Sequence, residues 1–284
     1  MSVNTISAIE REGYNEEMRL DYERMKSTFM KCTRQDGLLK AGTVVWETVD
    51  VTDAAQEKTR DGRIPISNLD HGRVTATPKR EYKKYEIDDF DVYRHNSTIR
   101  QVQQMKSVGA CHRACDQLIV DQLDGTSTEI NSGTAISFST YGNILNWIAQ
   151  LENNDVSTDN GQIWGAVTPM ALRQMMRINE FISHDYVETR KLENGIPGDG
   201  YYRWLGVNWF STTALTGKGT ATAKCYLFDT QAVGHQTLGE PDTMVDYNKE
   251  DDYWFNWAKI SHAAAVVLPR GVVRAVHDDT ATFT

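Results

Sequence analysis

The stretch "GTVVWETVDV", residues 42–51, has the composition of a β-strand, and its apolar side chains occupy both faces. The alternation places Val45, Val49 and Val51 on one face, and Val44, Trp46 and Thr48 on the other. Residues 53–72 follow with Gly, Pro, Asn and Asp but no hydrophobic period, which predicts a loop. The strand therefore needs both a pairing partner and a cover from elsewhere.

The nearest candidate partner is "RVTATPKREYKKYEI", residues 73–87, where Pro78 indicates a sheet edge because it has no N–H to donate. Unstructured loops of about 20 residues are uncommon inside compact domains. We therefore predict that the two strands pair as an extended arm with residues 53–72 at its tip. An isolated two-stranded ribbon is marginal in water and exposes edges, so we expect the arm to lie on its own domain or on another copy.

Helical patterns flank this arm on both sides. Apolar residues at spacings of three and four predict an amphipathic helix over residues 8–31, with a stripe of Tyr14, Met18, Tyr22, Met25 and Phe29. Residues 97–124 predict a second helix, roughly 40 Å long, with Ser97 as its N-cap and Gly125 after its end. The apolar band of this second helix winds around its axis, as expected of a structural spine.

The rest of the chain mixes helical and strand-like patterns. We expect helices at residues 140–151 and 169–181, the latter beginning at Pro169, and a buried strand in "IWGAVTP" between them. Three strand-like segments follow, separated by glycine-rich turns: "GYYRWLGVNWFSTT", "TAKCYLFDTQAVGHQT" and "AAAVVLPRGVVRAVHD". These patterns predict a mixed α/β domain.

The composition excludes several classes of protein. The chain has 284 residues, 40% of them hydrophobic and 24% charged, which is ordinary for a globular protein. Its net charge of −9 disfavours a general nucleic-acid binder. The first residues turn acidic at once, which argues against a secretory leader, and the run "AAAVVL" is too short to span a bilayer. Four scattered cysteines imply no disulfide framework, which suits a reducing cytoplasm.

Candidate chemical sites are sparse. Cys111 and Cys115 fall on one face of the expected helix with His112 nearby, a spacing that fits either a shared zinc or two buried core thiols. "VHDD", which contains His277, Asp278 and Asp279, fits either a metal or acid–base cluster or a polar strand end. "KEDDYWFNWA", residues 249–258, fits a ligand platform or an acidic turn before an aromatic core strand. We favour the structural interpretation each time and expect no catalytic, cofactor-binding or metal-binding residue.

The basic run "PKREYKK", residues 78–84, resembles a nucleic-acid stripe, but on an acidic chain it is more consistent with contact to an acidic surface, such as the 8–24 segment of another copy. We therefore expect contacts between subunits at residues from both strands of the arm, namely Val45, Trp46, Val49, Arg80, Lys83, Lys84 and Tyr85.

The order of these elements resembles that of the tailed-bacteriophage major capsid proteins with the Hong Kong 97-type fold. The stretch from "IWGAVTPMALRQMM" to "YYRWLGVNWFSTTAL" looks like the family's axial segment, and "HAAAVVLPRGVVRAV" looks like its closing strands. The resemblance implies a mixed α+β fold divided into an N-arm (1–39), an E-loop (40–92), the spine helix of a peripheral domain (93–130), an axial domain (131–261) and closing strands (262–284). It also implies that a neighbouring subunit covers the apolar side of residues 42–51.

The function implied by this resemblance is structural and not enzymatic. Such a protein assembles in the host cytoplasm into hexamers and pentamers of an icosahedral virion shell around double-stranded DNA, which it contacts non-specifically on the interior face. The implied partners are other copies of the chain, a separate scaffolding protein, a portal and cement or decoration proteins, with no membrane. The family's lysine–asparagine crosslink has no matching motif here, so non-covalent shells are expected. Two alternatives remain: an encapsulin nanocompartment shell, and a cytosolic metal-dependent hydrolase using His277, Asp278 and Asp279.

Overall fold

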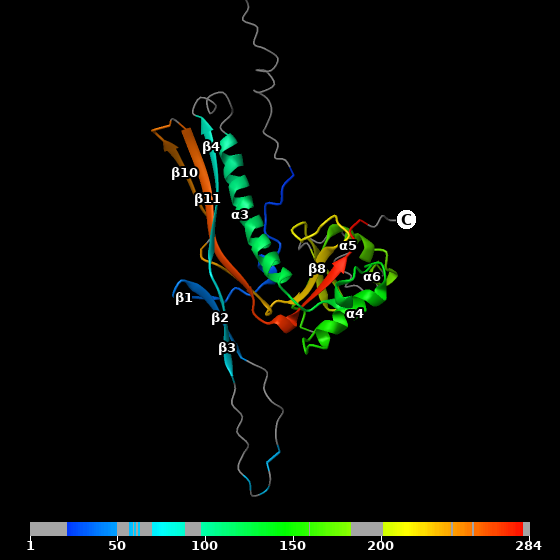
Figure 1. Cartoon of the computed structure of the whole chain (residues 1–284). Helices are drawn as coiled ribbons and strands as arrows, with labels where there is room; N and C mark the ends of the chain where they lie inside the picture. Colours follow the sequence, from blue (N-terminus) through cyan, green and yellow to red (C-terminus); the bar gives the residue numbers. More distant parts are fainter. Residues whose placement is uncertain are drawn as a thin grey trace, which may run out of the picture.

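The computed structural model describes residues 22–49, 57–58, 60, 62, 70–88, 98–158, 160–182, 201–239, 241–251 and 253–280. These residues form three parts: a long helix lying along a sheet, a second unit with a five-stranded sheet and short helices, and a small three-stranded sheet (Figure 1). This arrangement confirms the expected mixed α+β class. None of the helices in these ranges is long and apolar enough to cross a lipid bilayer.

The long helix, α3, spans Thr98–Asp124 and confirms the helix expected over residues 97–124. It packs on a sheet made by β4 (Lys79–Asp88), β9 (Val233–Thr237), β10 (Asp242–Asn248) and β11 (Tyr253–Val266). β11 is the central strand of this sheet. It pairs antiparallel with β4 along one edge, and with β10 and then β9 along the other. Strand β11 continues through residues 261 and 262, where a domain boundary was expected.

The second unit is built on a sheet with the strand order β12-β8-β5-β7-β6. Its strands are β5 (Ile163–Val167), β6 (Tyr202–Trp204), β7 (Val207–Ser211), β8 (Ala223–Asp229) and β12 (Val272–His277), and its helices are α4 (Tyr141–Glu152), α5 (Pro169–Met175) and α6 (Asn179–Ile182). β5 and β7 are parallel, and the other pairs are antiparallel. Trp147, Trp209 and Tyr226 are fully buried in the core of this unit.

Helix α5 begins where the sequence predicts. Pro169 occupies its first turn, and the Thr168 hydroxyl accepts a hydrogen bond from the Ala171 N–H at 3.1 Å, which caps the helix. The single helix expected over residues 169–181 is divided into α5 and α6, with turns at residues 176–178. The expected helix over 140–151 corresponds to α4.

The predicted arm is correct in its first half and wrong in its second. β2 (Thr43–Val49) pairs antiparallel with β3 (His71–Ala76), and β1 (Leu38–Lys40) pairs with the other edge of β2. The segment expected as one strand over 73–87 divides at residues 77–78, and β4 after it pairs with β11. Pro78 explains the break, because it cannot donate to a ladder. The expected tip, 53–72, lies mostly outside the described residues.

The amphipathic helix expected over residues 8–31 is wrong where the structure describes it. Residues 22–29 are non-helical and only Met30–Cys32 form a 3₁₀ turn, while residues 1–21 lie outside the described part of the chain. Of the expected stripe, Phe29 is fully buried and Tyr22 is exposed. Buried Asp116 of α3 accepts backbone hydrogen bonds from Thr28 and Phe29 at 3.1–3.2 Å, so tertiary contacts replace the helical ones.

Candidate assembly surfaces

The apolar side of β2 is covered by its own subunit. Trp46 is 1% exposed and packs with Val44 on Ala263 and Ala265 of β11. The indole also lies against Gly234, where an added Cβ would come within 2.6 Å of its Cε2 atom. The expectation that a neighbouring subunit covers this face is therefore wrong, because the strand that covers it comes from about 200 residues later in the same chain.

Part of the small sheet is nevertheless exposed. Val45 is 7% exposed, so neither it nor Trp46 offers a free side chain, but Val49 near the outer end of β2 is 52% exposed. The neighbouring strand β1 exposes Leu38 by 56% and Leu39 by 57%. Sequence reasoning missed this leucine pair, although two adjacent leucines just before a glycine turn were a readable signal.

The two faces of the helix-backed sheet differ sharply. On one face, Asn256 of β11 accepts a hydrogen bond from the Ser107 hydroxyl of α3 at 3.1 Å, and Ala258 packs with Cys111. Lys83 and Tyr85 are paired with Ala258 and Asn256, so they belong to this face.

The opposite face, which we term the open face, carries residues of alternate register. Arg80 and Lys84 of β4 lie on this face, where they are paired across the ladder with Ser261 and Trp257 of β11. The four residues expected to make contacts from the second strand of the arm are thus divided between two faces and do not form one surface.

The basic residues of this segment already have partners within the subunit. Lys84 forms an ion pair with Glu86 at 2.6 Å, and its Nζ lies 4.9 Å from the centre of the Phe255 ring. The hydrogen bond to Glu86 raises the pKa of Lys84. Arg80 donates to the Ser261 hydroxyl at 3.3 Å. Residues 8–21 of the expected acidic partner segment lie outside the described ranges, so that pairing stays a prediction.

An apolar stripe crosses the open face. The ring of Tyr82, which is 59% exposed, lies 6.4 Å from that of Trp257, and Trp257 is paired with Met244, which is 44% exposed. The aromatic segment 249–258 is therefore core on one face only, since Asn256 is buried and Trp257 is half-exposed. Contiguous exposed apolar groups of this kind mark interaction surfaces.

The sequence matches the family model described as phage capsid protein over residues 6–279. The chain belongs to the phage capsid protein family. Its fold is similar to that of a solved chain from Mycobacterium phage Che8. The TM-score is 0.68 and the identity is 16%, with coverage of 94% of this chain and 99% of that one. No curated protein matches the sequence.

Two further solved structures share the fold of this capsid protein. One is the capsid structure of the cyanophage P-SCSP1u, with a TM-score of 0.69, 12% identity and coverage of 98% of this chain and 97% of that one. The other is the capsid of Myoviridae phage XM1, with a TM-score of 0.66, 10% identity and coverage of 97% and 100%. The expected family resemblance is confirmed. The protein is a structural component of a capsid shell in the virion and not an enzyme.

In the capsid protein, the "VHDD" residues fasten the end of β12. His277 is fully buried, its Nδ1 lies 3.1 Å from the Ile136 carbonyl oxygen, and burial lowers its pKa. Asp279 accepts from the Thr168 hydroxyl and, at 2.8 Å, from the Gly219 N–H. Asp278 caps the following turn, accepting from the Thr280 N–H at 2.9 Å. These contacts explain the motif as a structural strand end, and the hydrolase interpretation is wrong.

The cysteines of the capsid protein are all buried free thiols. Cys111 and Cys115 both face β11, as expected of core residues, and burial raises the pKa of each thiol. The structure groups Cys115 with His235 and His262 instead of with Cys111 and His112. Sequence reasoning missed this grouping because its members come from three distant parts of the chain.

Proposed function

We propose that this capsid protein assembles in the host cytoplasm as the hexamers and pentamers of a tailed phage's icosahedral shell, which encloses double-stranded DNA. The observation that carries the proposal is the three-stranded sheet β1–β3, which exposes Leu38, Leu39 and Val49 away from the core of its own subunit. Exposed apolar residues of this kind favour contact with another copy.

The parts of the chain take the following roles in this proposal. The segment before residue 38 acts as the N-arm, and the sheet β1–β3 acts as the E-loop (Figure 1). The peripheral domain comprises α3 with β4, β9, β10 and β11, and the axial domain comprises the five-stranded sheet with its helices. This division ends the E-loop at residue 76 instead of 92, because β4 pairs with β11.

The contacts between subunits involve Leu38, Leu39 and Val49 of one copy and the open face of the β4–β11 sheet of another, with Arg80 and Lys84 of that face adding charged contacts. An exposed ion pair is worth about 0.2–1 kcal/mol, but a shell repeats each contact in every subunit. A separate scaffolding protein, a portal and decoration proteins complete the set of partners, and the DNA contact on the interior face is non-specific.

A leucine-to-lysine exchange tests this proposal. The free energy of unfolding of the double variant L38K/L39K should lie within about 0.5 kcal/mol of that of the parent, because both side chains are exposed. The variant should nevertheless give at least tenfold fewer shells by negative-stain microscopy. The matched variant L38M/L39M should assemble like the parent. Normal shell yield from L38K/L39K contradicts the contact, and a parent that forms only a small discrete species contradicts the shell function itself.

A further inference from the structure

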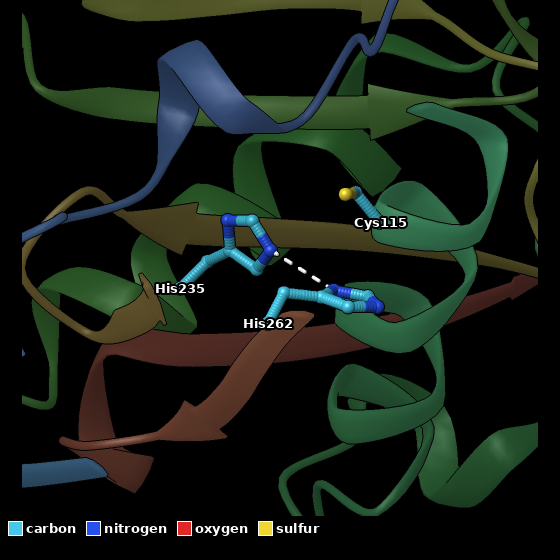
Figure 2. A group of neighbouring side chains, drawn as sticks. All are labelled: Cys115, His235 and His262. Atoms are coloured by element: carbon cyan, nitrogen blue, oxygen red, sulfur yellow. Dashed lines mark hydrogen bonds between the residues drawn. The ribbon is translucent and has the colours of Figure 1, made fainter. Parts of the chain in front are cut away.

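Three buried side chains from separate elements meet between α3 and the β9–β11 ladder. Cys115 of α3, His235 of β9 and His262 of β11 are each fully buried, and one ligand atom from each lies within 4.8 Å of the others. Figure 2 shows the Cys115 thiol beside the two imidazole rings, with a dashed line between the rings. Nε2 of His235 lies 3.3 Å from Nδ1 of His262. A thiol and two imidazoles are the donors that zinc prefers.

The spacing of these donors matches tetrahedral zinc. Zinc–nitrogen bonds of about 2.0–2.1 Å place two tetrahedral nitrogens roughly 3.3–3.4 Å apart, which is the separation of the His235 and His262 nitrogens. A zinc–sulfur bond of about 2.3 Å places the sulfur roughly 3.5–3.6 Å from each nitrogen. Since the Cys115 sulfur already lies within 4.8 Å of a nitrogen of each ring, an approach of at most about 1.3 Å completes the site.

A carboxylate stands behind one of the rings. If His262 binds through Nδ1, its Nε2 faces Oε2 of Glu81 on β4 at 3.8 Å. Zinc-binding histidines ordinarily direct their second nitrogen to such a carboxylate, which orients the ring and increases its basicity. The second nitrogen of the other ring, Nδ1 of His235, has no hydrogen-bond partner within the described ranges.

The surroundings suit an uncharged pair of rings and an entering cation. Both rings are fully buried, an environment that disfavours the charged form of a histidine, and metal-binding histidines must be neutral. A groove of about 440 Å³ lies beside the cluster, lined by residues that include Val108, Thr237 and Ile260. Thr237 is paired with His262 in the β9–β11 ladder, so this groove borders the cluster.

We propose that Cys115, His235 and His262 bind one Zn²⁺ per subunit, with water in the fourth position. Binding exchanges the thiol proton of Cys115 for a sulfur–zinc bond and releases that proton to solvent. The ion fastens α3 to both β9 and β11, and so holds the helix against its sheet independently of any contact between subunits.

Metal analysis of the purified protein tests this site. After growth with zinc and exhaustive dialysis, the parent should retain about one zinc per chain, and C115S should retain at least tenfold less. The matched control is C111S, which removes a buried thiol one turn away that lies outside the cluster. It should retain zinc like the parent. Equal zinc in C115S and the parent shows an adventitious surface ion only and overturns the proposal.

Two measurements on the parent need no variant and guard against misfolding of C115S. Replacing zinc with Co²⁺ should produce a thiolate-to-cobalt charge-transfer absorption, and zinc at a hundredfold excess over its Kd should raise Tm by about 5 °C relative to chelator. If the charge-transfer band is absent, or if zinc does not change Tm, zinc does not bind at Cys115.

Discussion

Replacing Asp116 with alanine should detach the segment before residue 30 from the body of the capsid protein. Asp116 is fully buried on α3 and forms an ion pair with Arg24 at 3.1 Å. Its carboxylate also accepts hydrogen bonds from the Ser27 hydroxyl, the Thr28 N–H and hydroxyl, and the Phe29 N–H. Arg24 in turn donates to Thr212 at 2.8 Å, just beyond β7. This segment therefore connects α3 to the five-stranded sheet.

The size of the effect follows from the burial of the carboxylate. Removing one partner of a buried ion pair costs about 3–5 kcal/mol, because the remaining charge and N–H groups lose their acceptor without regaining water. For a chain of this size, each kcal/mol lowers Tm by roughly 2–4 °C, so D116A should melt about 10 °C below the parent. Phe29 should also lose its packing against Phe210, because the centroids of the two rings lie 5.3 Å apart across the same junction.

Calorimetry of unassembled subunits measures the loss, and limited proteolysis shows whether cleavage near residues 22–30 becomes faster. The matched control is D121A on the same helix, whose exposed carboxylate accepts one hydrogen bond from Gln117. The free energy of unfolding of D121A should lie within about 0.5 kcal/mol of that of the parent. If D116A melts with D121A and resists protease equally, the carboxylate does not anchor this segment.

The remaining predictions concern packing, pH and covalent chemistry. G234A should cost about 1–3 kcal/mol by thermal melting, because its Cβ would meet the Trp46 indole at 2.6 Å, whereas G142A, with no atom within 4 Å, should not; equal melting points contradict the packing. Burial lowers the pKa of His277, which faces the Ile136 carbonyl, Asp278 and Asp279; since the unfolded chain then binds more protons, stability should fall as pH drops below about 6.5, and less steeply in H277Q. If the stability of H277Q falls with pH as steeply as that of the parent, His277 is not the cause of the pH dependence. Shells should survive reductant, because every cysteine is a buried free thiol, and boiled shells should run near 32.1 kDa; dissolution in reductant or a ladder of multimers disproves the respective claim.

The sequence by itself determined the elements whose pattern is local. Helix α3 follows from an uninterrupted apolar band over residues 98–124, and helix α5 follows from Thr168 and Pro169 at its start. Pro78 indicated a sheet edge, and both β3 before it and β4 after it are edge strands of their sheets. The order of these elements was enough to indicate the capsid family, because order survives changes that erase individual residues.

The tertiary structure decided which elements meet. The hydrophobic period of a segment does not predict that β4 pairs with β11. Nor does it predict that β11, and not another subunit, covers Trp46. Residues 22–29 are non-helical despite their helical pattern, and the buried Asp116 carboxylate accepts the backbone N–H groups of Thr28 and Phe29 there. The cluster of Cys115, His235 and His262 exists only after folding, since each residue alone is indistinguishable from a core side chain. Periodicity reports the burial of a face, whereas the identity of what buries it is a property of contacts between distant segments.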